Sequence, residues 1–489
     1  MKRESFGSRL GFILVSAGCA IGIGNVWKFP YICGAYGGAA FILIYLLFLI
    51  ILGIPVLVCE FAVGRGSRKS VALSFDELQS KNGKWTPLKF IGIIGCYMLM
   101  MFYTTVGGWL MYYCYKGIRG SFVNASSDNI STQFSQMLTD VPTMLFWTIL
   151  ICVIGFAVCM FGLNNGIERV TKVMMTALIL IMVVLAIRSV TMTGAGEGIR
   201  FYLIPDFHKM VESGIGNVVF AALSQAFFTL SIGIGAMLIF GSYLDQSRSL
   251  TGEAVNIMLL DTFVALTAGF IIIPACFAYG IEPGAGPSLI FITLPNIFAQ
   301  MSGGRIWAFL FFLFLTFAAL STIIAVFENL VMFNMELLGW RRKKSVLVCA
   351  ALIIILSIPC VLGFNVWSGV QLLGEGSTIM DLEDFIVSNN LLPLGSLGYV
   401  LFCTRKNGWG WDAFIKEVNT GSGMKFPKTL RGYVNYGIPA IIIVIYLKGY
   451  YDKFKDMGTE IFVGWMIFAI VFLAWVIYCA TSVEKDRTE

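Results

Sequence analysis

The sequence has little charge and almost no histidine. Asp, Glu, Lys and Arg make up 13% of 489 residues, there is one histidine, and mean hydropathy is +0.83. Soluble chains carry about 25% charged residues, so this composition excludes a soluble globular protein. An intramembrane enzyme needs a nucleophile with a base, or a metal cluster. Because His208 lies in a predicted outer loop and no Glu and His spacing resembles a metal site, we expect no enzyme.

Three further patterns are missing. The twelve cysteines include no CxxC pair and none lies in the predicted outer loop 118–141, so free, buried thiols are expected. No basic stripe with interleaved aromatics accompanies the net charge of +6, so no nucleic-acid partner is predicted. No filter motif indicates a channel.

Long apolar runs are abundant instead. A hydrocarbon core takes roughly 20 helical residues to cross, and these runs are far longer than the strands of a membrane barrel. The sequence therefore predicts an all-α polytopic membrane protein in the lipid bilayer of the cell membrane. Twelve spans are expected, at 9–35, 38–63, 89–117, 142–162, 167–188, 214–243, 251–278, 305–337, 345–362, 379–403, 433–449 and 459–480.

The basic residues predict the orientation of the chain. Most of the 34 Lys and Arg residues fall on one side if the spans alternate from the N-terminus, and cationic loops stay in the cytoplasm. With an even number of spans, both termini are predicted to be cytoplasmic.

Two spans contain the same glycine interruption. Ile21-Gly22-Ile23-Gly24 lies in the first span and Ile232-Gly233-Ile234-Gly235 in the sixth, 211 residues later. A lone glycine in a membrane helix usually permits close packing. Two breaks offset by five spans are instead typical of an inverted repeat with a midplane binding site, and the family named below is a standard example of this rule.

A broken membrane helix needs ligands for its backbone. Unpaired N–H and C=O groups are tolerated at this depth only where they line a cavity. Half-helix N-termini suit a carboxylate, and free carbonyls suit a small cation. Polar side chains near the breaks are Asn25, Gln225, Thr229 and Ser231. A sodium ion and a zwitterionic substrate are the predicted ligands, although such hydroxyls often only bond to their own helix.

Two later spans also carry polar groups. Asp261 lies near the middle of the seventh span with no cationic residue close in sequence, so a bound cation is a better explanation than a protonated, structural carboxyl. Ser321 and Thr322 follow Ala318 by one helical turn, which suits an oxygen-lined cation site.

The first span resembles a known family. Gly7-Ser8-Arg9-Leu10-Gly11-Phe12 and Gly18 to Tyr31 are similar to the neurotransmitter:sodium symporters, as are Gly53-Ile54-Pro55 to Glu60, Ser224 to Ser231 and Phe317 to Thr322. The resemblance implies a LeuT-type fold in a single transporter domain, 1–489. It divides the chain into a five-helix repeat (9–188), an inverted second repeat (214–403) and two additional helices (433–480).

The resemblance also implies two sodium sites. The first would use Ala20, Asn25, Thr229, Asp261 and the substrate carboxylate, and the second would use Gly18, Ile21, Ala318, Ser321 and Thr322. Chloride is not expected, because Asp261 stands where chloride-dependent members have Asn.

The implied substrate is a neutral, aliphatic or aromatic amino acid. Amine-transporting members have Asp where this chain has Gly22, so the substrate should bring its own carboxylate. The expected substrate-binding residues are Ala20, Gly22, Ile23, Gly24, Leu99, Tyr103, Phe228, Thr229, Ser231, Ile234, Thr322 and Val326. They include no acid or base, and burying a charged substrate side chain among them would be costly.

Gates follow from the same resemblance. Lys28 and Asp384 would form the outer gate, and Phe228 would be the lid over the substrate below it. Arg3 and Glu336 would form the inner gate. Lysine replaces the usual arginine at position 28 and cannot form its bidentate fork. Phe6 replaces the usual tryptophan near Arg3.

The predicted activity is sodium-coupled import of an amino acid by alternating access. A homodimer is possible in this family. A sensor that binds the same ligand without transporting it is the alternative that the sequence leaves open.

Overall fold

The membrane spans account for most of the chain. The computed structural model describes residues 4–81, 83–281 and 288–482. In these ranges ten helices are long and apolar enough to cross a membrane, and an eleventh is a pair bent by 58°. The all-helical prediction is confirmed, whereas the predicted twelve spans exceed this number by one.

The difference lies at 214–243, where the predicted span is two helices. α12 (Ile215–Thr229) and α13 (Ala236–Tyr243) are each too short to cross a bilayer alone. The break between them is the glycine interruption that the sequence indicated.

The other spans lie close to their predicted places. They are α1 (Arg9–Ala20) with the π-turn η1 (Gly24–Lys28) and α2 (Phe29–Ala35); α3 (Ala39–Phe48) with η2 (Leu49–Gly53) and α4 (Ile54–Ser67); α6 (Lys89–Arg119); α8 (Val141–Met160); η4 (Leu163–Glu168) with α9 (Arg169–Val190); α14 (Leu250–Ala278); α16 (Gly304–Leu338); α17 (Arg342–Leu362); α18 (Ile379–Ile386) with η6 (Val387–Leu391) and α19 (Leu392–Thr404); η8 (Tyr433–Gly437) with α21 (Ile438–Phe454); and α22 (Thr459–Thr481).

The predicted loops also contain helices. Short helices outside the spans are α5 (Val71–Leu78), α7 (Ser127–Thr139), α10 (Ala195–Leu203), α11 (Phe207–Glu212), α15 (Leu294–Gln300) and α20 (Trp411–Val418). α7 lies in the predicted loop 118–141 and begins where the Ser126 hydroxyl accepts a hydrogen bond from the Asn129 N–H. Such a side-chain cap stabilises the first turn.

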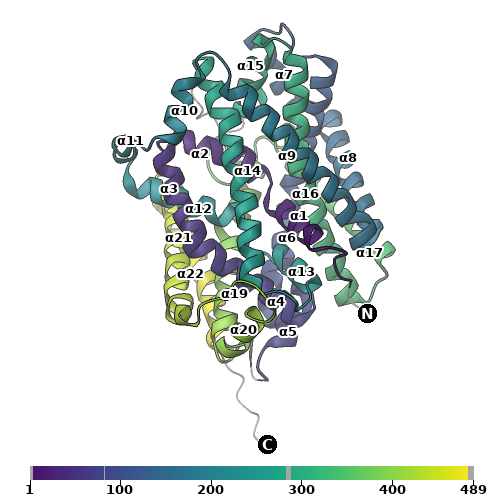
Figure 1. Cartoon of the computed structure of the whole chain (residues 1–489), viewed down its shortest axis with the longest axis vertical. Coiled ribbons are helices and arrows are strands. Elements are labelled where there is room, and N and C mark those ends of the chain that lie inside the picture. Colours follow the sequence, from purple (N-terminus) through teal and green to yellow (C-terminus); the bar gives the residue numbers. More distant parts are fainter. Residues whose placement is uncertain (1–3, 82, 282–287, 483–489) are drawn as a thin grey trace, which may run out of the picture.

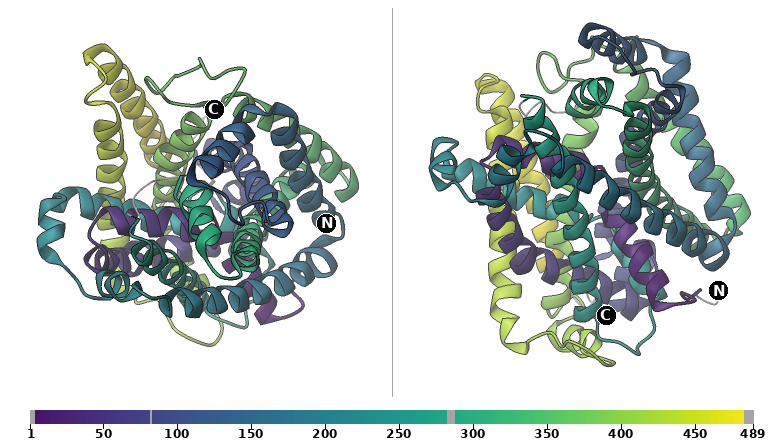
Figure 2. Two further views of the ribbon diagram at one scale, coloured as in Figure 1. Left: turned by 90° about the horizontal axis from the view of Figure 1, so that it is seen from above. Right: turned by 45° about the horizontal axis from the view of Figure 1, so that its top comes forward.

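Burial separates the central helices from those that face lipid. In the most apolar stretch of α16, 78% of residues are buried, against 17% in α22. α16 packs along α6, α1, α8 and α9, while α21 and α22 stand together at the edge of the bundle (Figures 1 and 2). Apolar residues exposed on α22 suit lipid contact, because lipid tails replace water as solvent. All twelve cysteines are free and buried, as predicted.

Candidate functional site

The first break lies between α1 and α2 and is held open by side chains. α1 ends at Ala20, and the Gly22 N–H donates to Asn25 Oδ1 at 3.2 Å. The Ile23 N–H donates to the Tyr103 hydroxyl of α6 at 2.9 Å. A Cβ on Gly22 would lie 2.2 Å from that hydroxyl, which no side chain tolerates without a shift. Glycine is therefore required here for the close approach of α6.

The second break, residues 230–235, depends on left-handed backbone. Ser231, Gly233 and Gly235 have φ of 50°, 104° and 76°. Glycine reaches these angles without steric cost. A Cβ on Gly233 would lie 2.1 Å from the Leu392 carbonyl oxygen, so this break also packs directly against the backbone of α19.

Glu60 caps the N-terminus of α13, the helix that follows the second break. Its carboxylate, fully buried in α4, accepts hydrogen bonds from the N–H groups of Gly233 (2.8 Å), Met237 (3.0 Å) and Leu238 (3.3 Å). The expectation that half-helix N-termini offer free N–H groups to a substrate carboxylate is thus wrong for α13. An internal carboxylate already occupies that position and offsets the helix dipole.

Three residues of the first predicted sodium site form one buried cluster. Asn25 Nδ2 lies 2.8 Å from Thr229 Oγ1 and 2.8 Å from Asp261 Oδ1, and Thr229 Oγ1 donates to Asp261 Oδ2 at 2.9 Å. All three are fully buried. The Thr229 hydroxyl and the Asp261 carboxylate offer the oxygen ligands that hard cations prefer. The Asn25 amide turns its nitrogen to both of them and its oxygen to the Gly22 N–H, so it would have to rotate to add a third oxygen ligand.

The second predicted sodium set meets around one hydroxyl. Thr322 Oγ1 lies 3.2 Å from the Gly18 carbonyl oxygen, 3.3 Å from those of Cys19 and Ile21, and 3.4 Å from that of Ala318. Ser321 Oγ donates to the Ala318 carbonyl at 2.9 Å. One hydroxyl proton can satisfy only part of this group of acceptors. The remaining oxygen atoms could therefore serve as ligands for a small cation.

A small cavity lies where the two breaks face each other. It is about 20 Å³ in volume, and its lining comprises Ala20, Gly22, Gly24, Leu99, Tyr103, Phe228, Ser231, Ile234, Thr322 and Leu392. Nearly all of these residues were predicted to bind substrate; Leu392 was not. No charged side chain is among these described lining residues.

Three predicted binding residues are not among those that line this cavity. Ile23 lines the vestibule, Thr229 belongs to the cluster with Asp261, and Val326 is fully buried in α16. The structure therefore brings the predicted binding residues together around one cavity, apart from these three.

A larger vestibule of about 240 Å³ lies beyond Phe228. Phe228 and Tyr103 line both spaces, and Lys28, Asp381 and Asp384 line the vestibule. Lys28 Nζ lies 4.0 Å from the centroid of the Phe228 ring. Asp384 accepts a hydrogen bond from Ser388 Oγ at 2.7 Å, and no ion pair within 4.0 Å joins Lys28 to Asp384 in the ranges described. The two predicted gate residues thus share the vestibule while each has another partner.

An inner cavity of about 350 Å³ lies at the other end. Glu336 lines it and accepts hydrogen bonds from the Ser70 N–H at 2.9 Å and the Ser70 hydroxyl at 2.7 Å. Arg3, its predicted partner, lies outside the described residues. Phe6 packs against Phe12, Phe240 and Tyr243, with ring centroids 5.5, 6.3 and 5.9 Å away.

Comparisons with known proteins match nearly the whole chain. A model of the "Sodium:neurotransmitter symporter family" matches residues 3–136 and 128–483. The chain is a member of the sodium:neurotransmitter symporter family. An uncharacterized sodium-dependent transporter of Bacillus subtilis (strain 168), YhdH, is 35% identical over 91% of this chain and 98% of its own length. The sodium-dependent serotonin transporter of Drosophila melanogaster is 28% identical over 95% of this chain and 80% of its length.

A solved structure shares the fold of this family member. The crystal structure of MhsT in complex with L-phenylalanine has a TM-score of 0.82 and 35% identity, covering 92% of this chain and all of that one. The predicted LeuT-type fold is confirmed, and the chain is a multi-pass, sodium-dependent membrane transporter rather than an enzyme.

The transporter contains a buried ion pair that sequence reasoning missed. Arg342 of α17 donates to Glu328 of α16 through Nη1 (2.7 Å) and Nη2 (2.9 Å), and the Tyr243 hydroxyl donates to Glu328 at 2.9 Å. Glu328 is fully buried and Arg342 is 16% exposed. The sequence does show an acid, Glu328, inside an apolar helix. It does not show which of the neighbouring basic residues 341–344 is its partner.

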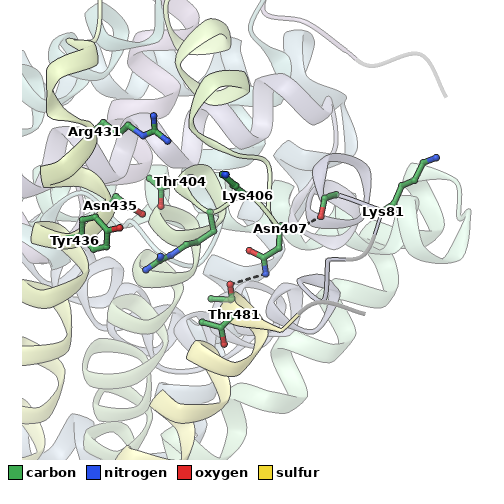
Figure 3. A pocket seen from close by; sticks show the side chains of 11 residues that line it. Lys81, Thr404, Lys406, Asn407, Arg431, Asn435, Tyr436 and Thr481 are labelled. Atoms are coloured by element: carbon green, nitrogen blue, oxygen red, sulfur yellow. Dashed lines mark hydrogen bonds between the residues drawn. The ribbon is translucent and has the colours of Figure 1, made fainter. Parts of the chain in front are cut away.

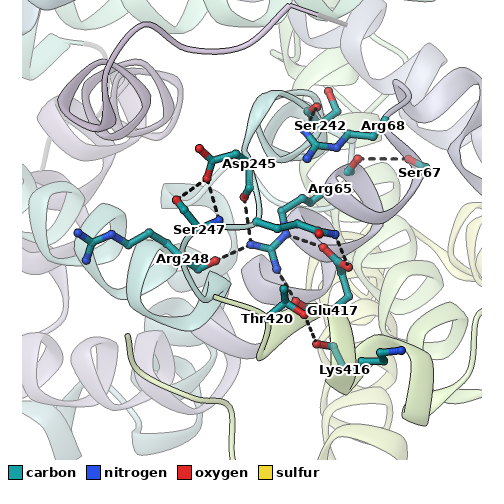
Figure 4. A network of polar contacts seen from close by, with 12 residues as sticks. Arg65, Ser67, Arg68, Ser242, Asp245, Ser247, Arg248, Lys416, Glu417 and Thr420 are labelled. Carbon is teal, nitrogen blue, oxygen red and sulfur yellow. Dashed lines mark hydrogen bonds and ion pairs between the residues drawn. The ribbon is translucent and has the colours of Figure 1, made fainter. Parts of the chain in front are cut away.

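A second missed network joins three segments at the same end. Arg65, fully buried at the end of α4, donates through Nε to Glu417 Oε1 at 2.6 Å and through Nη1 to the Arg248 carbonyl at 2.6 Å; Nη2 bonds the Glu417 carbonyl (Figure 4). α20 and the segment after α13 are thereby fastened to α4. Arginine's planar fork suits this combination of acceptors.

Proposed function

We propose that this transporter is a symporter that couples sodium entry to the import of a neutral, hydrophobic amino acid. The observation that carries the proposal is the central cavity, lined by both broken helices and by uncharged side chains alone. A charged substrate side chain would lose its hydration there without a partner.

The first break is the proposed contact for the substrate carboxylate. Gly22 supplies no negative charge, and the Tyr103 hydroxyl already reaches the backbone of the break at Ile23. The Met237 and Leu238 N–H groups of α13 already bond the charged Glu60, whereas the Gly22 and Ile23 N–H groups bond neutral partners that a carboxylate can replace. The substrate carboxylate is therefore proposed to bind the first break, Tyr103 and a sodium ion. The substrate amino group would then face the carbonyls of the second break.

The substrate side chain would lie against Leu99, Phe228 and Ile234. MhsT, which is 35% identical and aligns with 92% of this chain, is solved with bound L-phenylalanine. This complex supports an apolar substrate for the present chain. At about 20 Å³ the cavity must widen to hold an amino acid, and the half-buried Phe228 ring is the element free to move toward the vestibule.

Two sodium ions are proposed, one at each oxygen cluster. Asn25, Thr229 and Asp261, with the Ala20 carbonyl, would hold the ion that also contacts substrate. Gly18, Ile21, Ala318, Ser321 and Thr322 would hold the second, which bridges α1 and α16. Binding of both would fasten the first break before the inner side opens.

Transport independent of chloride is proposed from Asp261. Its fixed carboxylate, fully buried beside Asn25 and Thr229, supplies the negative charge that a bound anion would otherwise provide. Cytoplasmic termini are proposed from the distribution of basic residues.

The decisive experiment is uptake into proteoliposomes. Purified protein is reconstituted, and radiolabelled phenylalanine or leucine is followed with an inward sodium gradient or with potassium replacing sodium. We expect accumulation only with sodium, and competition by neutral apolar amino acids but not by lysine or glutamate. Sodium-dependent binding without accumulation would identify a sensor instead, and uptake unchanged by sodium removal would overturn the coupling.

The chloride proposal has its own test. Wild-type uptake is measured with gluconate replacing chloride, beside Asp261→Asn. Wild-type transport should be unchanged, whereas Asp261→Asn should lose most uptake in gluconate and regain part of it in chloride. Loss of wild-type uptake in gluconate would contradict the role given to Asp261.

A further inference from the structure

A cationic cavity lies away from the transport pathway, where three membrane spans end. It has a volume of about 790 Å³ and lies between the end of α19, the start of the α21 span, the end of α22 and the segment after α5. Figure 3 shows Arg431, Asn435 and Tyr436 on one side of it and Asn407 and Lys81 on the other. Its size is that of a site for a small ligand.

The charges around this cavity all have one sign. Lys81, Arg405, Lys406 and Arg431 line it, and the described lining residues include no Asp or Glu. None of the four forms an ion pair within the described part of the chain. Four cations with no acidic partner among the described residues repel one another in one concave site, so the site favours an anion.

Two buried polar atoms in the cavity also lack partners among the residues that the structure describes. Arg405 Nε and Asn435 Oδ1 are shielded from solvent and make no hydrogen bond to the described residues. The Arg405 guanidinium carbon lies 5.6 Å from the centroid of the Tyr436 ring. This contact orients the guanidinium group. A buried donor or acceptor without a hydrogen bond costs free energy. A ligand that accepts a hydrogen bond from Arg405 and donates one to Asn435 would satisfy both atoms.

The frame of the cavity is held by hydrogen bonds. Asn407 Nδ2 donates to the carbonyls of Ala480 (3.0 Å) and Ser482 (3.2 Å), and Ser80 Oγ donates to the Asn407 carbonyl at 2.9 Å. These bonds join the end of α22 to the segments after α19 and α5. The cavity is therefore a built feature rather than a gap between loose ends.

The location of the cavity identifies the source of the anion. Thr404 and Thr481 are the last residues of two spans, and the α21 span begins at Lys428. The cavity lies at the level where apolar spans give way to polar chain, which is where lipid phosphates lie. Tyr436, 64% exposed, suits the same interface.

We infer that this cavity binds the headgroup of an anionic glycerophospholipid. Arg405, Lys406 and Arg431 contact the phosphate, and Asn435 accepts a hydrogen bond from a glycerol hydroxyl. Basic pockets between membrane helices recognise anionic headgroups in this way. The site binds lipid independently of the transported substrate.

Native mass spectrometry of the full-length protein tests the inference. The protein, in detergent, is titrated with phosphatidylglycerol, phosphatidylcholine or inorganic phosphate. One phosphatidylglycerol should bind to the wild type at least about tenfold more tightly than to Arg405→Gln/Arg431→Gln, because each cation near an anionic lipid contributes measurably. Phosphatidylcholine should bind equally to both.

Lys343→Gln/Lys344→Gln is the matched control, since it removes the same charge from exposed positions of α17 outside the cavity. It should bind phosphatidylglycerol as the wild type does. Arg405→Lys/Arg431→Lys, which retains both charges, should lose less affinity than the Gln pair and guards against misfolding of the latter. Equal loss in the control, or no loss in the Gln pair, would overturn the inference. Displacement of phosphatidylglycerol by millimolar inorganic phosphate, with phosphate binding as tightly, would identify a soluble anion as the ligand and overturn the lipid assignment.

Discussion

The two ends of the central cavity are closed by different means. On the vestibule side the closure is one aromatic ring, Phe228, with the Lys28 ammonium 4.0 Å from its centroid. On the inner side α16, α17 and α13 are joined by the charge-assisted bonds of Glu328 with Arg342 and Tyr243. The outer closure is thus a single side chain, whereas the inner helices are joined through buried charges.

This difference predicts which end of the cavity opens more easily. Breaking a buried ion pair leaves uncompensated charge and costs several kcal/mol, while moving a half-buried ring costs much less. For the proposed import, we therefore expect that substrate and sodium cross only a small barrier on the vestibule side, and that the inner side stays closed until ligand binding has contributed free energy. The following substitutions are ordered by the size of their expected effect on this contrast.

Arg342→Gln should have the largest effect, because it leaves the Glu328 carboxylate buried without its cation. We expect a loss of about 3–5 kcal/mol in the stability of the inner-closed form. Thermal unfolding in detergent should shift to lower temperature, and cysteines introduced beside the inner cavity should be labelled faster. Glu328→Gln/Arg342→Gln, which removes both charges, should recover most of the loss, and failure to recover would show that the pair is not the closure.

Arg65→Gln comes next. It removes the donors to Glu417 and to the Arg248 carbonyl, and hydrogen bonds to charged groups contribute about 2 kcal/mol. Faster proteolysis of the segment between α13 and α14 should report release of that segment from α4. The exposed Lys416, on the same helix as Glu417, provides the control Lys416→Gln. Equal cleavage of wild type and Arg65→Gln would mean that the network does not fasten this segment.

Phe228→Ala should weaken substrate binding by about tenfold, roughly 1.4 kcal/mol, with little change in thermal unfolding. The ring separates the cavity from the vestibule, so its removal lets water reach the bound substrate. Scintillation proximity binding with sodium present measures the effect. Phe220→Ala, two turns earlier on α12 and outside the central cavity, should bind substrate normally. A large loss of folding stability in Phe228→Ala would indicate that the ring is structural.

Lys28→Met should have the smallest effect. A cation over an exposed aromatic ring contributes about 0.5–1 kcal/mol, so substrate dissociation should accelerate by no more than about fivefold. Lys28→Arg keeps the cation and adds a fork that suits Asp384, and it should slow dissociation. Faster dissociation from Lys28→Arg than from Lys28→Met would reverse the proposed role.

Sequence reasoning located the two helix breaks. Residues predicted for each sodium site lie together in the structure, and their binding of sodium stays a prediction. Repeated glycines in apolar helices have few explanations, and polar residues such as Asp261 and Thr322 stand out among apolar neighbours. The three clustered residues Asn25, Thr229 and Asp261 come from three helices, and their convergence was supplied by the family resemblance rather than by spacing.

The pairings between distant segments were not predicted. Glu60 and the N-terminus of α13 are more than 170 residues apart, and Arg65 and Glu417 more than 350. Nothing local in the sequence selects one acid among several for such a contact. The position of Lys28 over Phe228 depends similarly on how η1 and α12 approach each other, which composition does not determine.

The twelve buried, free cysteines make the chain a convenient reporter of its own motion. With its pathways closed, the protein should give almost no reaction with a polar maleimide, so a single cysteine introduced in the vestibule can be labelled without first removing the native ones. Cys19 and Cys96 lie beside the two breaks, and Cys159 accompanies Arg342, whose Nη1 donates to its carbonyl at 3.1 Å. Which of these thiols becomes reactive as sodium and substrate are added would record the order in which the two ends open.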